Sequence, residues 1–237
     1  MLPANLKTLV HFNGADAATT FPDFTGRHTW SANGNAQLDT AQKKYGASAL
    51  LLDGTGDFIS SPDSPDWKIC AATNETWTIS LQIKFNVATG LQYLASQFVN
   101  ATNYWDILHY DGNGLRFICV AGGSNVIVMS YAGEINDTNW HEIMIHKKAG
   151  APNAMWGMYK DGQQILNVSS AGIANFTAPL HIGTENAGGY VNGWVDELMI
   201  CQSNPFNADP QADNSDTVTP TSKEWGVEAL NRVMAVQ

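Results

Sequence analysis

Charged side chains are scarce in this sequence. They make up 14% of its 237 residues, whereas an average soluble domain has about 25%. Bases are the scarcer kind: 12 lysines and arginines stand against 22 acids, which gives a formal net charge of −10. A surface of that sign repels phosphate groups, so we expect no nucleic-acid partner.

Long apolar runs are also missing. No stretch approaches the ~20 apolar residues of a membrane-spanning helix. The N-terminal sequence MLPANLKTLVHFNG has no basic region followed by an apolar one. The sequence therefore predicts no membrane insertion, and it shows no secretory signal peptide.

Cysteines are few, three in all, which is too few for a disulfide framework in a chain of this length. Cys119 and Cys201 fall in apolar runs that are expected to be strands. The sequence therefore predicts buried free thiols, and one disulfide with one cysteine left over is the alternative. The six histidines show no spacing typical of a shared metal site, and no phosphate-binding or nucleophile motif is present.

The residues that are present predict β-structure. In WTISLQIKF, residues 77–85, apolar and polar side chains alternate, which is the pattern of a half-buried antiparallel strand. Similar short runs recur through the first 200 residues, separated by turn dipeptides such as Asp161-Gly162. No helical period is visible before residue 220. Many short strands with turns between them favour a sandwich or a barrel.

The C-terminal segment departs from this pattern. Residues 203–221 are polar and acidic and contain prolines, which is typical of a linker or of an arm along the surface. Thr221 and Glu224 then have the spacing of a helix capping box. We therefore expect a domain over residues 1–202, followed by a C-terminal arm and a short helix over residues 203–237.

The expected short helix carries Leu230 and Val233 on one face, and Trp225 adds an aromatic anchor at its start. An isolated helix needs about 12–15 residues to be stable, so these side chains need a surface to pack against. A neighbouring subunit is the predicted host, because a closed sandwich offers little free apolar surface. Packing on the chain's own domain is the alternative.

Two adjacent acids interrupt an apolar run in GGYVNGWVDELMI, residues 188–200. Successive side chains of a strand point to opposite faces, so either Asp196 or Glu197 is directed toward a buried face. An unpaired buried carboxylate costs several kcal/mol. For Asp196 three interpretations are open: hydrogen bonds from backbone amides or an arginine, a calcium ion, or catalysis. Because the two acids are adjacent, we expect them to face opposite ways.

The order of the motifs resembles the concanavalin A-like, laminin G-like jelly-roll family, especially its members in phage structural proteins and bacterial surface proteins. The resembling motifs span residues 6–201. They are LVHFNG (9–14), FPDFTGRHTW (21–30), GNAQLDTAQKKYGASALLLDGTGDFISSPDSPDW (34–67), WTISLQIKF (77–85), NWHEIMIHK (139–147), YKDGQQI (159–165), LHIGT (180–184) and GWVDELMI (193–200). The resemblance implies an all-β, two-sheet antiparallel jelly-roll sandwich with about six or seven strands in each sheet, with the first and last strands adjacent.

The resemblance also implies a structural calcium ion. Many members of this family hold one calcium with an acid at the position of Asp196 and with main-chain oxygens from two early segments. Here those oxygens would come from around Asn13 and Gly46. Calcium is a hard cation that takes oxygen ligands of these kinds. Asp196, Asn13 and Gly46 are therefore the expected metal site.

Catalysis is not expected. A glycosidase needs two carboxylates about 5–10 Å apart across the scissile bond. Glucanases on the fold that this chain resembles typically carry a Glu-x-Asp-x-x-Glu run, which this sequence lacks. Lyases of the same fold use arginine, glutamine, histidine and tyrosine on strands. The nearest candidates, Gln97, His109, His141 and Tyr159, match no such spacing.

Aromatic residues near turns indicate a ligand site. Residues 100–114 combine Tyr104, Trp105 and Asp106 with turn-forming residues, and Tyr190 lies in a second such segment. Sugars pack their C–H surfaces on exposed aromatic rings and bond to nearby polar groups. These four residues are therefore the expected glycan-binding positions.

Together these features predict a non-catalytic protein of the virion surface, such as a phage tail or capsid appendage or decoration protein. Its expected partners are a glycan or a neighbouring virion subunit, and we expect a homo-oligomer. The alternatives are a secreted carbohydrate-binding module, which would be extracellular, and a polysaccharide-degrading enzyme on the same fold.

Overall fold

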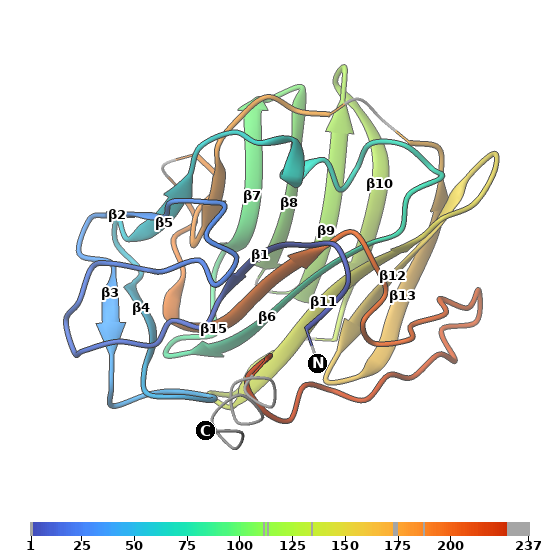
Figure 1. Cartoon of the computed structure of the whole chain (residues 1–237). Coiled ribbons are helices and arrows are strands. Elements are labelled where there is room, and N and C mark those ends of the chain that lie inside the picture. Colours follow the sequence, from blue (N-terminus) through green and yellow to red (C-terminus); the bar gives the residue numbers. More distant parts are fainter. Residues whose placement is uncertain are drawn as a thin grey trace.

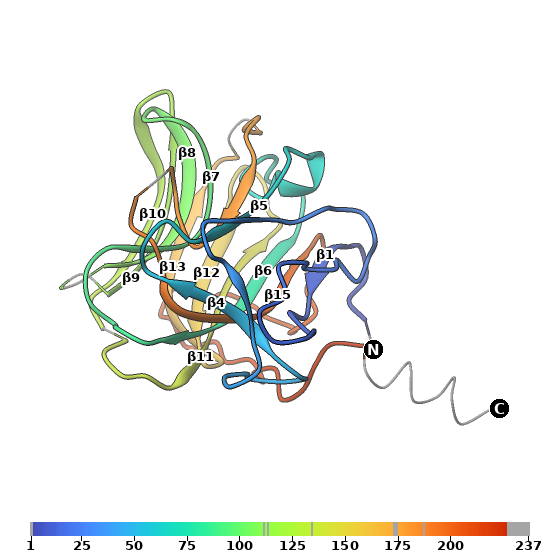
Figure 2. The same cartoon turned by 90° about the vertical axis from the view of Figure 1, so that its left-hand side faces the viewer.

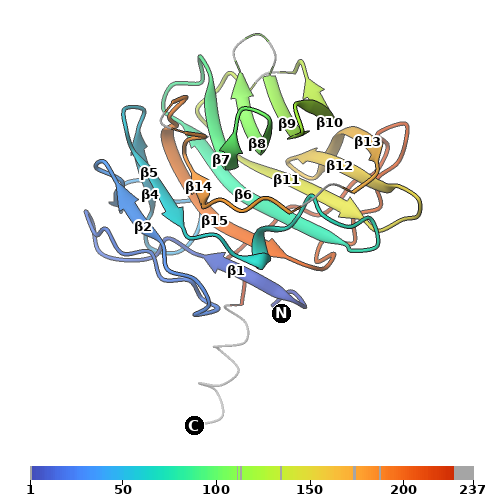
Figure 3. The ribbon, with the colours of Figure 1, turned by 90° about the horizontal axis from the view of Figure 1, so that it is seen from above.

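The computed structural model describes residues 2–110, 112, 114–133, 135–172, 175–186 and 188–226. In these residues two antiparallel sheets lie face to face (Figures 1, 2 and 3). Sheet A contains, in spatial order, β13 (Gln163–Ser170), β12 (Ala154–Lys160), β11 (Trp140–Lys148), β6 (Trp77–Phe85), β15 (Asn192–Cys201), β4 (Ala49–Asp53) and β3 (Gln37–Asp39), and β1 (Leu6–Val10) also pairs with β15. Sheet B contains β10 (Ser124–Tyr131), β9 (Gly114–Ala121), β8 (Asn103–Tyr110), β7 (Gln92–Asn100), β14 (Leu180–Ile182), β5 (Phe58–Ser61) and β2 (Ser31–Asn33). A single 3-10 turn, η1 (Pro65–Trp67), follows β5 in the described chain.

The expected all-β jelly-roll sandwich is confirmed, with one strand more in sheet A than expected. The predicted contact between the first and last strands is also present, since Leu9 of β1 pairs with Met199 of β15. The expected helix does not begin at Thr221, because the backbone of residues 221–226 is not helical. Residues 227–237, which include the rest of that helix, lie outside the described residues.

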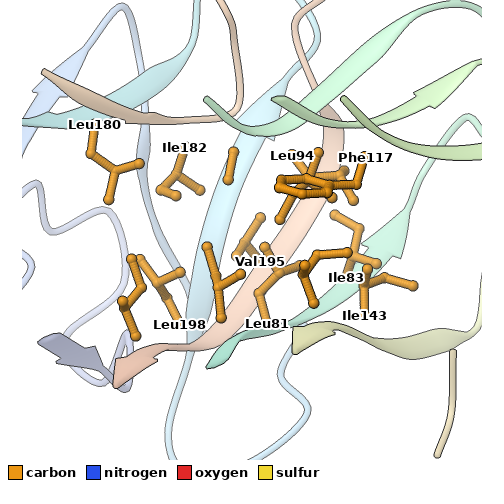
Figure 4. Close-up of a cluster of buried hydrophobic side chains, with 14 of the residues drawn as sticks. Leu81, Ile83, Leu94, Phe117, Ile143, Leu180, Ile182, Val195 and Leu198 are labelled. Atoms are coloured by element: carbon orange, nitrogen blue, oxygen red, sulfur yellow. The ribbon is translucent and has the colours of Figure 1, made fainter. Parts of the chain in front are cut away.

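The main core lies between the sheets. Figure 4 shows the side chains of two layers pointing toward one another. Sheet A contributes Leu81, Ile83, Ile143, Val195 and Leu198, and sheet B contributes Leu94, Phe117, Leu180 and Ile182. The alternation of β6 produces this arrangement, because Leu81 and Ile83 point inward while Ser80 and Gln82 point outward. Ser80 and Gln82 are nevertheless buried, so the outer face of sheet A is also covered.

The segment that covers it is the C-terminal arm, which we define as residues 203–226. The arm passes β12 first, where Pro210 packs against Gly157. It then bonds to β13 through Gln164 N, which donates to Asp216 O at 3.1 Å. Figure 1 shows this red segment leaving β15, passing below β12 and β13 and returning toward the N-terminus.

The arm returns over β11 and β15. Thr221 N donates to Glu142 Oε2 at 2.6 Å, and Trp225 N donates to Glu197 Oε2 at 3.2 Å. A second, smaller apolar cluster lies between the arm and the outer face of sheet A. Its buried members are Leu9, Met144, Tyr159, Met199, Cys201, Phe206 and Ala208.

These contacts correct the expectation for Trp225. Trp225 packs against the second cluster, which includes Leu9 and Met199 of sheet A, and its ring meets that of Phe206 edge-on, with centroids 5.5 Å apart. It therefore packs on the chain's own domain. Sheet A has an apolar outer face that alternation alone did not suggest, and the arm fills it. Leu230 and Val233, the other expected partner contacts, lie outside the described residues.

All three cysteines are free and buried, as predicted. In the described part of the chain, no helix is long and apolar enough to cross a membrane.

Candidate functional site

The outer face of sheet B carries Tyr104 and Asp106. Along β8, Trp105 and Ile107 point into the main core, so the residues between them point outward. Asp106 lies opposite Ser96 of β7 and Ile118 of β9. Alternation along one central strand thus places a carboxyl group in the middle of this face.

A loop between β14 and β15 folds over the same face. The Oγ of Ser96 donates to the carbonyl oxygen of Thr184 at 2.8 Å, and Tyr93 N donates to Gly189 O at 2.8 Å. A ring nitrogen of His181 is 2.8 Å from the carbonyl oxygen of Glu185. These bonds hold the loop on β7 and place the Glu185 side chain next to Asp106.

Asp106 and Glu185 form an acid pair. Asp106 is 1% exposed, and this burial raises its pKa, which the charge of Glu185 and a hydrogen bond with Glu185 raise further. Burial also raises the pKa of Glu185. Two carboxyl groups in such contact titrate together and share a proton. The shared proton removes the repulsion between two negative charges in a buried site.

Two tyrosines and an arginine surround the acid pair. Burial raises the pKa of Tyr93 and of Tyr104, and the negative charges of Glu185 and Asp106 raise these two pKa values further. The positive charge of Arg116 lowers them. Both rings are half-buried, and Arg116 Nε donates to Ser130 Oγ at 2.9 Å. We call this group the sheet B cluster; it consists of Tyr93, Tyr104, Asp106, Arg116 and Glu185.

A hollow of about 330 Å³ adjoins the cluster. Its lining residues are Gly54, Val87, Thr89, Leu91, Gln92, Gly189, Tyr190 and Asn192. Tyr190 stacks on Phe58 with ring centroids 6.4 Å apart. Gly189 lies so close to the ring of Tyr93 that a Cβ there would clash with it, and thus the hollow and the cluster share a border.

The structure therefore brings three of the four expected ligand residues, Tyr104, Asp106 and Tyr190, to one region. Trp105 is different: it is fully buried, and its Nε1 donates to Gln97 Oε1 at 3.1 Å. A tryptophan inside the core has no contact with a surface ligand, so the expectation for Trp105 was wrong. The period of two along β8 was the signal that separates it from its neighbours.

Sequence reasoning missed Tyr93, Arg116 and Glu185. Tyr93 and Arg116 are outward residues of strands whose pairing was unknown, and they become neighbours because both lie opposite Leu108. Glu185 comes from a loop that reaches Asp106 only after β14 has paired with β7. No local pattern identifies such a residue.

The expected calcium residues lie at the edge of sheet A. Asp196 Oδ2 accepts hydrogen bonds from Lys44 N at 2.8 Å and Tyr45 N at 3.0 Å, and Oδ1 accepts one from Glu197 N at 2.9 Å. Burial raises the pKa of Asp196 to about 7, and the amides of Tyr45 and Lys44 oppose that rise. The amide interpretation of Asp196 is therefore what the geometry shows.

Asn13 and Gly46 are neighbours here. Asn13 Oδ1 accepts a bond from Ala47 N at 2.6 Å, and Gly46 has φ +61° with Asn13 directly against it. Oxygens of both Asp196 and Asn13 therefore accept backbone N–H groups in this arrangement. Calcium at Asp196, Asn13 and Gly46 stays a prediction.

A family model described as the concanavalin A-like lectin/glucanase superfamily matches residues 53–208, which is more than half of the chain and extends into the arm. No curated protein matches the sequence.

Solved structures show the same fold. Domain 4 of AbnA, an extracellular arabinanase from Geobacillus stearothermophilus in complex with arabinotriose, is 17% identical with a TM-score of 0.62, over 84% of this chain and 93% of that chain. The binding domain of botulinum neurotoxin DC, in complex with rat synaptotagmin II, is 16% identical with a TM-score of 0.62. The match covers 84% of this chain and 49% of that chain.

A third structure concerns botulinum neurotoxin type C, whose cell entry is described as dependent on interaction with two ganglioside molecules. It is 14% identical with a TM-score of 0.63, over 84% of this chain and 48% of that chain. The present chain thus spans about half the length of these two toxin chains. Identities this low show the fold alone, whereas the family model covers most of the sandwich. The chain belongs to the concanavalin A-like lectin/glucanase superfamily.

Proposed function

We propose that this protein is a non-catalytic glycan-binding domain that holds its ligand on the outer face of sheet B. One observation carries the proposal. The outer face of sheet A is covered by the chain's own arm, whereas the outer face of sheet B presents the sheet B cluster, with half-buried tyrosine rings, beside a hollow.

The chemistry of this face suits a sugar. The rings of Tyr93 and Tyr104 offer apolar surfaces for sugar C–H groups, and their hydroxyls donate and accept hydrogen bonds. Glu185 and Arg116 supply an acceptor and donors for sugar hydroxyls. The loop bonds to Ser96 and Tyr93 fix these groups in place, which lowers the entropy cost of binding.

Burial of Asp106 favours binding over catalysis. A glycosidase holds its two carboxyl groups about 5–10 Å apart, so that both reach the scissile bond or its attacking water. Asp106 is 1% exposed and forms a hydrogen bond with Glu185. Its role is therefore to hold the Glu185 carboxyl group in position. Two compared proteins support a sugar as ligand: the arabinanase domain is in complex with arabinotriose, and cell entry of the type C toxin is described as dependent on two ganglioside molecules. A virion-surface location with a neighbouring subunit as second partner stays a prediction, which detection of the protein in purified virions tests.

The direct test is a glycan array followed by calorimetry with the best ligand. We expect Tyr93→Ala and Tyr104→Ala each to weaken binding at least tenfold. Val128→Ala, on the same sheet but on edge strand β10 and 42% exposed, is the matched control and should bind like the wild type. Unchanged glycan affinity in both tyrosine variants would contradict the proposal that the outer face of sheet B is the binding surface.

The same preparations test for catalysis. Release of reducing ends or unsaturated products from a polysaccharide, abolished in Asp106→Asn, would replace the binding proposal by an enzymatic one. We expect no turnover.

A further inference from the structure

Three potential metal ligands from distant parts of the sequence converge at the edge of sheet A. His11 follows the end of β1, Glu197 lies in β15, and Glu224 lies in the arm. One ligand atom from each of these residues lies within 4.8 Å of the other two. The His11 Nδ1 atom is 2.6 Å from Glu197 Oε1.

The fold explains why these groups meet. Val10 pairs with Leu198, which puts His11 beside Glu197. A β-bulge in β15 gives Glu197 a φ of +50° and turns its carboxylate to the outer face of sheet A. The arm then supplies Glu224, because Trp225 N bonds to Glu197 Oε2 and Asn13 Nδ2 donates to Glu224.

The electrostatic surroundings favour a cation. Glu142 and Asp196 are buried near Glu197. Among the described residues, Glu197 forms an ion pair with His11, and no ion pair is seen for Glu142 or Asp196. A divalent ion would neutralise the excess negative charge at this place.

We propose that His11, Glu197 and Glu224 bind a divalent transition-metal ion of the Zn²⁺ or Mn²⁺ type and thereby fasten the arm to the sandwich. An imidazole nitrogen with two carboxylates suits these ions, and three protein ligands leave one position for water. Calcium prefers oxygen ligands alone. The site shares no residue with the expected calcium set of Asp196, Asn13 and Gly46.

A second histidine with two acids provides the matched control. His141 contacts Asp161 through Nδ1 at 2.6 Å and Asp137 through Nε2 at 3.0 Å. These carboxylates lie on opposite edges of the ring, so they do not converge on one ion. His141→Ala removes a comparable cluster without touching the proposed site.

The experiment uses the full chain stripped with a chelator and titrated with ZnCl₂, MnCl₂ and CaCl₂ by calorimetry. We expect one zinc ion per chain, with calcium at least tenfold weaker. His11→Ala and Glu224→Gln should each weaken zinc binding at least tenfold, while His141→Ala leaves it unchanged. Bound cobalt(II), used as a spectroscopic probe, should show absorption bands that disappear in His11→Ala.

A second readout follows the arm itself. Zinc should slow proteolysis within residues 203–226 of the wild type, and this protection should be lost in Glu224→Gln, which tests the site even if His11→Ala fails to fold. Absence of one-site zinc binding, or equal binding by the wild type and Glu224→Gln, overturns the proposal. Zinc binding that is lost in Asp196→Asn but kept in His11→Ala places the metal at the other site and also overturns it.

Discussion

Asp196 and Glu197 are adjacent in the sequence, yet both carboxylates lie on the outer face of sheet A. Asp196 pairs with Gln82, and the next paired residue of β15 is Met199, opposite Ser80. The extra residue of this bulge and the positive φ of Glu197 break the alternation that a regular strand imposes. The expectation that the two acids face opposite ways was therefore wrong.

The carboxylate of Glu142 should be the strongest polar attachment of the arm. It accepts bonds from Thr221 N, Thr221 Oγ1 and Ser80 Oγ, and Glu142→Ala leaves these buried or half-buried donors unpaired. We expect the free energy of unfolding to fall by about 2–4 kcal/mol in denaturant titrations. The ion pair of Lys148 with Asp209 also links sheet A to the arm but is exposed. Lys148→Ala should therefore cost less than about 1 kcal/mol, and similar losses in both variants would contradict this assignment.

Phe206 should anchor the arm through apolar packing. It is 9% exposed and lies in the cluster with Met144, Met199 and Tyr159. Phe206→Ala should lower the free energy of unfolding by about 3 kcal/mol, and truncation after Ser203 should leave a destabilised, aggregation-prone sandwich because it uncovers that cluster. Thermal melting and light scattering measure both effects. A truncated domain with an unchanged melting temperature would show that the arm is dispensable.

The acid pair on sheet B should make stability fall as pH rises. The pKa of Asp106 is higher in the folded protein than in the unfolded chain, so the folded state binds more protons between these two values. The stability that this proton provides is present below the unfolded pKa and is lost as pH rises through the folded one.

Asp106→Asn should remove the loss of stability at high pH, because asparagine resembles the protonated acid and does not ionise. The variant should match the wild type near pH 4 and exceed it by about 2 kcal/mol near pH 9. Denaturant midpoints measured from pH 4 to 9 provide the check. Parallel curves for the two proteins would mean that Asp106 has an ordinary pKa.

Substitutions at Trp105 and at Tyr104 should affect protein stability and glycan binding differently. Trp105→Phe removes a fully buried indole and its bond to Gln97, so the free energy of unfolding should fall by about 1–3 kcal/mol with glycan affinity unchanged. Tyr104→Ala should do the reverse, with a small change in stability and a large loss of affinity. Loss of binding in folded Trp105→Phe would place that residue near the ligand after all.

Much of the fold was accessible from local patterns. Strict alternation in WTISLQIKF and hairpin dipeptides such as Asp161-Gly162 identify strands and turns, because each depends on a few neighbouring residues. The contact between the first and last strands, in which Leu9 pairs with Met199, was expected from the family resemblance, although the register was not. The packing of the arm on the outer face of sheet A was not expected. A polar, proline-containing segment such as residues 203–221 has no periodicity that indicates which surface it packs on.

The candidate site was only partly accessible for a related reason. Tyr104 and Asp106 were recognised by residue type, whereas Arg116 and Glu185 reach them through strand pairing and a long loop. The bulge at Glu197 likewise depends on how β15 pairs with β6. Residues whose roles depend on long-range register have no signature in one sequence.

The return of the arm brings the two described ends of the chain together, with the side chain of Leu2 against Gly226. In Figure 3 the N-terminus lies on the side of the molecule opposite β7, β8 and β9. A carrier protein or support joined at either end would therefore hold the molecule from behind sheet A. Every copy attached in this way would turn Tyr93 and Tyr104 outward, so the arm determines the direction in which the domain is displayed.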